Sequence, residues 1–264
     1  MSGLLGEIGT IEWSRRTNGI LGRREKARFM AAVVMKTSTA LPRVLALRAR
    51  RRGSGPDPSQ LTPPDTPFAR EVVEACAELG PMVVEHSYRS YIFGRALGIV
   101  EGVECDEEAL FAATMFHDYA FTELESLEGK CFTLAGAEAA AGFLESSPLS
   151  EASRHDVLDA ISQHLNPDVP LERGAVQRLT HDGVILDVLG IRGWELDQPG
   201  IDRVMETHPR HGFTVDGAPL LRGHGRRVHG CRAGALFLCG FGPALRMSPW
   251  HPADRATAAG AVSS

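Results

Sequence analysis

Apolar residues recur at helical spacing along most of the chain, and no segment shows the alternation typical of a strand. Between Met82 and Ile99, for example, His86, Phe93 and Leu97 fall on one stripe. The pattern therefore predicts an all-α fold. The predicted helices are 23–36, a short helix after a break, 68–79, 82–99, 106–117, 134–145, 151–165 and 175–189.

Polar residues and glycine mark several of the predicted helix ends. Asp106 is a favoured N-cap, and Glu107 and Glu108 follow in the first turn, where the helix dipole favours acidic side chains. Ser150 is expected to cap the helix that begins after it, and Gly190 to end the helix that precedes it. These residues therefore indicate where the predicted helices begin and end.

Two changes of composition divide the chain into three parts. Proline, glycine and serine concentrate between residues 53 and 67, where a helix cannot continue. Beyond Phe213, glycine, arginine and histidine follow in irregular order, which predicts weak order. We therefore expect a basic helical N-terminal extension with a linker (1–66), a helical domain (67–213) and an irregular tail (214–264).

The N-terminal part carries most of the concentrated positive charge. Arginines are paired at 15–16 and 23–24 and form a run at 48–52. We interpret this charge as a solvated basic arm; the alternative is a surface for a partner or a membrane. Charged residues and a proline interrupt the apolar stretch 29–47, so no membrane span is expected.

Overall composition is that of a globular protein with a sizeable core. Of 264 residues, 43% are apolar, and the net charge is −5, so nucleic acid is not an expected partner. The five cysteines are odd in number and show no C-x-x-C spacing, which indicates a reduced, cytoplasmic protein and argues against a cysteine zinc site. The histidines at 208, 211, 224 and 229 likewise fit no finger spacing.

Histidines and aspartates in apolar helical sequence are the candidate functional residues. His86, the pair His117-Asp118, His164 and Asp187 all stand in such surroundings, where a polar group is costly to bury without a partner. A divalent metal can pair with all of them. Imidazole and carboxylate ligands suit zinc, iron, manganese or magnesium rather than a thiolate-seeking ion.

Alternatives remain at some of these positions. A salt bridge to Arg192 or Arg178 would also account for Asp187. The dipeptide His-Asp occurs twice more. The pair at 155–156 is interpreted as a solvated first helical turn, and the pair at 181–182 as a substitute ligand source if Asp187 is misassigned.

The order of a histidine, a His-Asp pair and a distal aspartate on helices resembles the HD-domain superfamily of metal-dependent phosphohydrolases. The resemblance covers roughly residues 67–213 and is strongest to the cyanamide-hydratase-type branch. It implies an HD-domain helical bundle with one divalent metal, zinc, iron or manganese, that activates a water. The segments that carry it are 86–91, 116–119, 161–164 and 175–190. The ligands it implies are His86, His117, Asp118 and Asp187.

The resemblance also suggests catalytic roles. His164 would lie beside the open coordination position, as a proton carrier or as part of a second metal site. Arg89, one turn from His86, is a candidate for orienting an anion; otherwise it is a surface charge. No lysine follows the His-Asp pair, where the sequence runs Tyr119-Ala120-Phe121-Thr122, and this weakens the case for phosphoryl transfer.

The expected function is metal-dependent hydrolysis of a small, phosphorylated or unphosphorylated substrate. One alternative is hydration of a small nitrile such as cyanamide, which needs no phosphate-binding cation. Another is a degenerate HD domain that acts as a binding module. The sequence leaves a homo-oligomer open.

Overall fold

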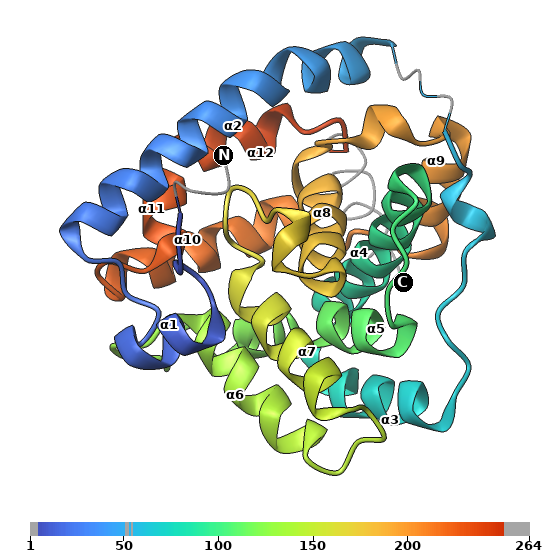
Figure 1. Ribbon diagram of the computed structural model, residues 1–264. Coiled ribbons are helices and arrows are strands. Elements are labelled where there is room, and N and C mark those ends of the chain that lie inside the picture. The colour runs from blue at the N-terminus through green and yellow to red at the C-terminus, as the bar shows by residue number, and fades with distance from the viewer. Residues whose placement is uncertain (1–4, 51–52, 54, 251–264) are drawn as a thin grey trace, which may run out of the picture.

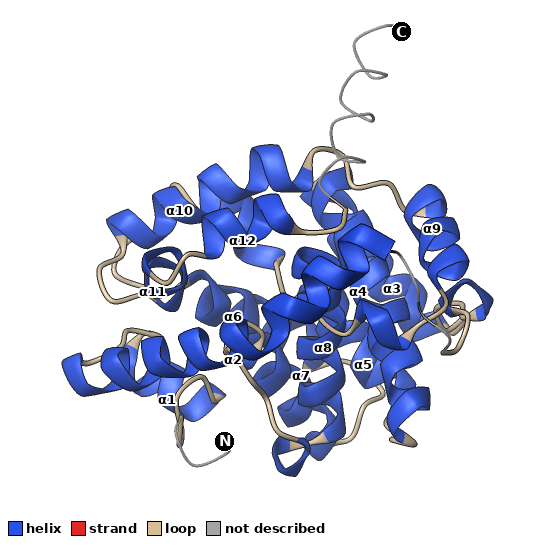
Figure 2. Ribbon diagram, turned by 90° about the horizontal axis from the view of Figure 1, so that it is seen from above, coloured by secondary structure: helices blue, strands red, loops and turns tan. Residues whose placement is uncertain are grey.

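The computed structural model describes residues 5–50, 53 and 55–250. The described residues are helical, as predicted, and contain no β-sheet (Figures 1 and 2). The α-helices are α1 (Ile11–Thr17), α2 (Arg23–Arg50), α3 (Pro67–Cys76), α4 (Pro81–Glu101), α5 (Glu107–Phe116), α6 (Phe132–Leu144), α7 (Glu151–Gln163), α8 (Ala175–Leu189), α9 (Gln198–Thr207), α10 (Ala218–Arg227), α11 (Arg232–Leu238) and α12 (Phe241–Met247).

The predicted helix boundaries in the central region are confirmed within a few residues. The Asp106 side chain accepts a hydrogen bond from the Ala109 N–H, and Ser150 does the same for Ser153. Gly190 ends α8 with φ 73°, a left-handed conformation that glycine adopts without steric cost. Local sequence signals therefore define these ends.

The centre of the fold is the close packing of α4 against α8, with α5 and α7 beside them. Gly94 on α4 and Gly183 on α8 allow the two backbones to approach. A β-carbon on Gly183 would overlap the Ser90 carbonyl oxygen, and one on Gly94 would press against the Leu179 carbonyl. This contact places the side chains of both helices within reach of one another.

Helix α2 corrects the prediction of a break near residue 36. The structure has one helix of 28 residues that continues through Pro42. An internal proline removes one backbone hydrogen bond, but packing on either side outweighs this cost. Phe29 and Leu47 are both buried against the rest of the molecule. The helix runs along one side of the fold, beside α11 and α12 (Figure 1).

By length and composition, Arg23–Ala49 of α2 is also apolar enough to cross a membrane. In this structure Val33 and Val44 face the body of the protein, whereas Val34 and Leu45 are exposed. The expectation that the chain has no membrane span therefore stays a prediction.

The prediction of an irregular tail is wrong for residues 214–250. This segment forms the turn η6 (Phe213–Gly217) and helices α10, α11 and α12, and it buries Leu221, Leu236 and Leu245. These helices span only 7 to 10 residues, too short for a clear apolar period. Residues 251–264 lie outside the described part of the chain.

The N-terminal extension is likewise packed on the body. The Ile11 N–H donates to Asp159 on α7 at 2.8 Å, and the Ser14 and Ser162 hydroxyls lie 2.7 Å apart. These buried polar contacts join α1 to α7. Buried hydrogen bonds therefore join the N-terminal segment to the central helices.

We predict that Gly183→Ala destabilises the protein by about 1–3 kcal/mol, the usual cost of forcing extra atoms into a close-packed contact. Urea unfolding followed by circular dichroism measures the change. Gly142→Ala on α6 is the matched control, because a β-carbon there meets no atom of the described part of the chain within 4 Å. The control should be neutral or slightly stabilising, since alanine favours helix. Equal effects of the two substitutions would contradict the close approach of α4 and α8.

Candidate metal centre

Four neighbouring helices bring the predicted site residues together. His86 lies in the second turn of α4. His117 directly follows α5 and is followed by Asp118, and His164 directly follows α7. Asp187 lies near the end of α8. All five are buried, with side chains that point to the region between these helices.

Two of the histidines are oriented by the same local device. The Nδ1 atom of His117 lies 2.6 Å from the Thr114 carbonyl oxygen, and that of His164 lies 2.8 Å from the Ile161 carbonyl oxygen. A carbonyl oxygen only accepts, so Nδ1 carries the proton in both rings. In the neutral ring, the end of each helix thereby directs an Nε2 lone pair inward.

The His86 ring is held in the same tautomer by a side chain and not by a backbone carbonyl. Its Nδ1 atom lies 2.6 Å from Asp187 Oδ2. Burial opposes ionisation of Asp187, but Arg210 and Arg89 hold the pKa of its carboxyl well below the usual range. An ionised carboxylate only accepts, so His86 Nδ1 donates and its Nε2 atom also presents a lone pair.

The acceptor atoms converge on one point. The Nε2 atoms of His86 and His117 are 3.1 Å apart. An oxygen of Asp118 lies 3.4 Å from His117 Nε2 and 3.8 Å from His86 Nε2. Asp118 Oδ1 lies 3.6 Å from His164 Nε2. Lone pairs and a carboxylate at these distances repel one another unless a proton or a metal cation lies among them.

The electrostatics of the group agree with this need for positive charge. Burial raises the pKa of Asp118, but His117 and the other two histidines outweigh it, so the carboxyl stays ionised. Burial lowers the pKa of His117, yet the charge of Asp118 more than reverses this and raises it overall. Burial lowers the pKa of His86, and burial with the charge of His117 lowers that of His164 to about 3.

His86, His117 and Asp118 fit a divalent metal. Their ligand atoms all lie within 4.8 Å of one another, and all three residues are buried. Zinc–nitrogen bonds of about 2.0–2.1 Å place two tetrahedral imidazole nitrogens about 3.3 Å apart, close to the 3.1 Å separation here. These three of the four predicted ligands are therefore brought together, with His164 beside them.

Asp187 occupies a different place from the predicted one. It contacts the Nδ1 atom of His86, on the opposite side of the ring from Nε2, and is not part of the convergent group. Both of its oxygens are engaged by arginines: Arg89 at 2.8 and 3.0 Å and Arg210 at 2.8 Å. Asp187 therefore forms a salt bridge, but its partners are Arg89 and Arg210 and not the expected Arg192 or Arg178. Asp187 orients a candidate ligand.

Arg89 also differs from its predicted role. Its guanidinium is fully buried and donates to Asp187 and to the carbonyl oxygens of His208 and Pro209. It does not line the cavity beside the candidate ligands. In this arrangement Arg89 joins α4, α8 and the segment after α9, and it is not placed to orient an anion.

Sequence reasoning missed Arg210 as a site residue. Its Nη1 atom donates to both the Oδ1 atom and the carbonyl oxygen of Asp187. The nearby Phe213 ring packs on His86, with ring centroids 4.3 Å apart. Nothing local in the sequence ties Arg210 to a histidine on α4.

The other two His-Asp pairs stand apart from the centre. Asp182 is held by Arg178 and Arg192, and the Nδ1 atom of His181 lies 3.3 Å from the His164 carbonyl oxygen. His155 is exposed and faces Glu12. Neither pair contributes an atom to the convergent group.

A cavity of about 100 Å³ adjoins His86, Asp118 and His164, and its remaining walls are mostly apolar. Those walls come from three parts of the chain. The lining includes Val33 and Lys36 of α2, Phe132 of α6, Val184, Ile185 and Val188 of α8, Phe213 of η6, and Leu221, Leu236, Phe241 and Leu245 of the C-terminal helices. The N-terminal extension and the tail therefore complete the cavity.

No protein-family model and no curated protein matches this sequence.

We predict that Asp187→Asn destabilises the fold by about 3–5 kcal/mol, because it leaves Arg89 and Arg210 buried without their carboxylate. Urea denaturation measures the change. Glu138→Gln is the control, since Glu138 is exposed and, within the described residues, pairs with Lys130, and such surface pairs contribute about 0–1 kcal/mol. A loss at Asp187 no larger than the loss at Glu138 would rule out the buried network as a stabilising element.

Proposed function

We propose that this protein is a metal-dependent enzyme of the HD type, in which an activated water adds to a small, uncharged substrate. Hydration of a small nitrile such as cyanamide is the reaction that the site favours. The observation that carries the proposal is the convergence of three Nε2 lone pairs and a carboxylate beside a small apolar cavity.

His86, His117 and Asp118 would hold the metal, and their nitrogen and oxygen donors suit zinc, iron or manganese. A cation bound there polarises a water and lowers its pKa, to about 7 for zinc. Asp187 fixes the tautomer and the ring orientation of His86, and the Thr114 carbonyl does so for His117. Such outer contacts commonly tune a metal ligand.

The cavity supports a small substrate. Its volume of about 100 Å³ is below the roughly 150 Å³ of an apolar cavity that accepts benzene. A nitrile of a few heavy atoms fits such a space. Addition of one water to its carbon, with the two protons ending on nitrogen, gives the amide.

The charges around the cavity support an uncharged substrate. Among the described residues that line it, Lys36 alone has a lysine or arginine side chain, and Lys36 forms a 2.6 Å ion pair with Asp168. Arg89 is held by Asp187. Phosphoryl transfer depends on cationic groups that stabilise developing negative charge. This arrangement favours hydration over phosphate-ester hydrolysis.

His164 is suited to orienting the attacking water. The pKa of about 3 keeps the ring neutral at pH 7, with Nδ1 donating to the Ile161 carbonyl. Its Nε2 atom can then accept a hydrogen bond from a water in the cavity. A group with so low a pKa stores a proton poorly, so positioning is the role that its surroundings support.

We expect the purified protein to bind a divalent metal at this centre and to gain stability from it. Excess Mn²⁺, which does not select thiolate ligands, at about 100 times Kd should stabilise the fold by about 2.7 kcal/mol, measured by thermal unfolding with and without chelator. His117→Ala should remove this gain, whereas His155→Ala, at an exposed histidine, should keep it. A gain in stability that survives His117→Ala would place the metal elsewhere.

We expect metal-loaded protein to convert cyanamide to urea and to leave a generic phosphate ester intact. Both reactions are measured on the same preparation, by urea release and by phosphate release. His117→Ala should reduce urea release to background, and His155→Ala should not. Release of phosphate without urea would contradict hydration and support phosphohydrolysis. Release of neither product by protein with bound metal would support a binding module.

A further inference from the structure

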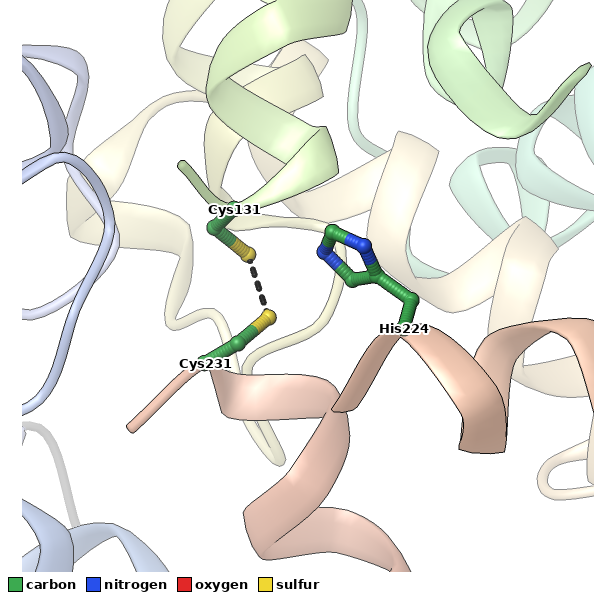
Figure 3. A group of neighbouring side chains, drawn as sticks. All are labelled: Cys131, His224 and Cys231. Atoms are coloured by element: carbon green, nitrogen blue, oxygen red, sulfur yellow. Dashed lines mark hydrogen bonds between the residues drawn. The ribbon is translucent and has the colours of Figure 1, made fainter. Parts of the chain in front are cut away.

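A second group of potential ligands lies between the tail and the start of α6. Cys131 directly precedes α6, His224 lies in the last turn of α10, and Cys231 directly precedes α11 (Figure 3). All three are buried, and their ligand atoms lie within 4.8 Å of one another. The two sulfurs are 2.8 Å apart.

His224 presents its Nε2 atom to the sulfurs. Figure 3 shows this edge of the ring turned toward Cys131 and Cys231. Its Nε2 atom accepts a hydrogen bond from the Phe132 N–H at 3.3 Å, so it carries a lone pair, and an ion bound to Nε2 would take the place of that N–H. Nδ1 lies 3.4 Å from the Leu124 carbonyl oxygen. A ring whose Nδ1 donates to a carbonyl is the usual arrangement of a histidine that ligates through Nε2.

A buried cation beside the sulfurs favours their ligand form. Arg232 is fully buried, and the partners of its Nη atoms are neutral: Asn166 Oδ1, Thr133 Oγ1 and the Ser162 carbonyl. Its Nε atom has no hydrogen-bond partner among the residues that the structure describes. A guanidinium in such surroundings stabilises a nearby anion, and the thiolate is the form of cysteine that binds metal.

We propose that Cys131, His224 and Cys231 form a second, structural binding site for a thiophilic cation, Zn²⁺ or Cu⁺. Two sulfurs and one imidazole nitrogen are soft donors of the kind these ions select. Zinc–sulfur bonds of about 2.3 Å require sulfurs about 3.8 Å apart, so binding separates the two thiols by roughly 1 Å. This site is distinct from the His-Asp centre.

The position of the site indicates what the ion would do. The ligands join α10 and the start of α11 to the start of α6, 100 residues earlier in the chain. The neighbouring Phe132 ring packs edge-on against both His224 and His164, each at 5.7 Å between centroids. An ion at this place would fasten the tail to the body and support one wall of the cavity.

The experiment uses the full chain carrying His117→Ala, so that the first centre does not contribute. The reduced, metal-free protein is titrated separately with Zn²⁺ and, without oxygen, with Cu⁺, and bound metal is measured after gel filtration. Co²⁺ serves as the spectroscopic probe for zinc, because thiolate ligands give it a charge-transfer absorption. We expect retained Zn²⁺ or Cu⁺ and a higher melting temperature with whichever ion binds.

Cys231→Ser in the same background should abolish both the retained metal and the stabilisation. Cys239→Ser, at a partly exposed cysteine outside the cluster, should preserve both. Failure of the His117→Ala protein to retain either ion would overturn the proposal, as would a Cys131–Cys231 disulfide in protein purified without oxidant. If Cys231→Ser does not fold, the thiolate band of Co²⁺ in the parent decides: its absence rejects a cysteine site.

Discussion

The buried carboxylate of Asp187 is the interaction on which the site depends. It accepts hydrogen bonds from His86, Arg89 and Arg210, and so connects α4, α8 and the segment after α9. Burying one carboxylate with two guanidinium groups is costly unless every polar atom is satisfied. The carbonyl oxygens of His208 and Pro209 complete the partners of Arg89. The cost of burying these charges is thereby offset, and the His86 ring is held in one orientation.

The same principle extends to the other histidines. His117 and His164 each follow the last residue of a helix and donate to a carbonyl of its final turn. A helix end leaves such carbonyls without partners, so these contacts satisfy the backbone and fix the tautomer together. Three rings thus direct lone pairs toward Asp118, and the repulsion among them is what a cation relieves. The hydrogen bonds at the three Nδ1 atoms therefore determine which ring nitrogens are available to bind a cation.

The outer segments take part in this architecture. Residues of α2 and of the C-terminal helices line the cavity that the central helices leave open. Arg232 in the tail contacts Asn166 and the Ser162 carbonyl, on either side of His164 in sequence. The central helices supply the candidate ligands, and the two ends of the chain decide how much space remains beside them.

The sequence by itself determined the all-α class, the central helices with their Asp106 and Ser150 caps, and the grouping of His86 with His117 and Asp118. The helix class and the caps depend on apolar periodicity and local capping within a few turns of one helix. The three candidate ligands come from two different helices, and their grouping was expected from the resemblance to the HD-domain superfamily. The tertiary structure alone decided that Asp187 orients a ligand, because its partners are 98 and 23 residues away. Only the tertiary structure showed that residues 218–247 form helices, which are too short to display an apolar period. Only the tertiary structure placed Cys131 beside Cys231, whose spacing matches no motif. Such pairings depend on how helices pack, and that information is spread over the whole chain.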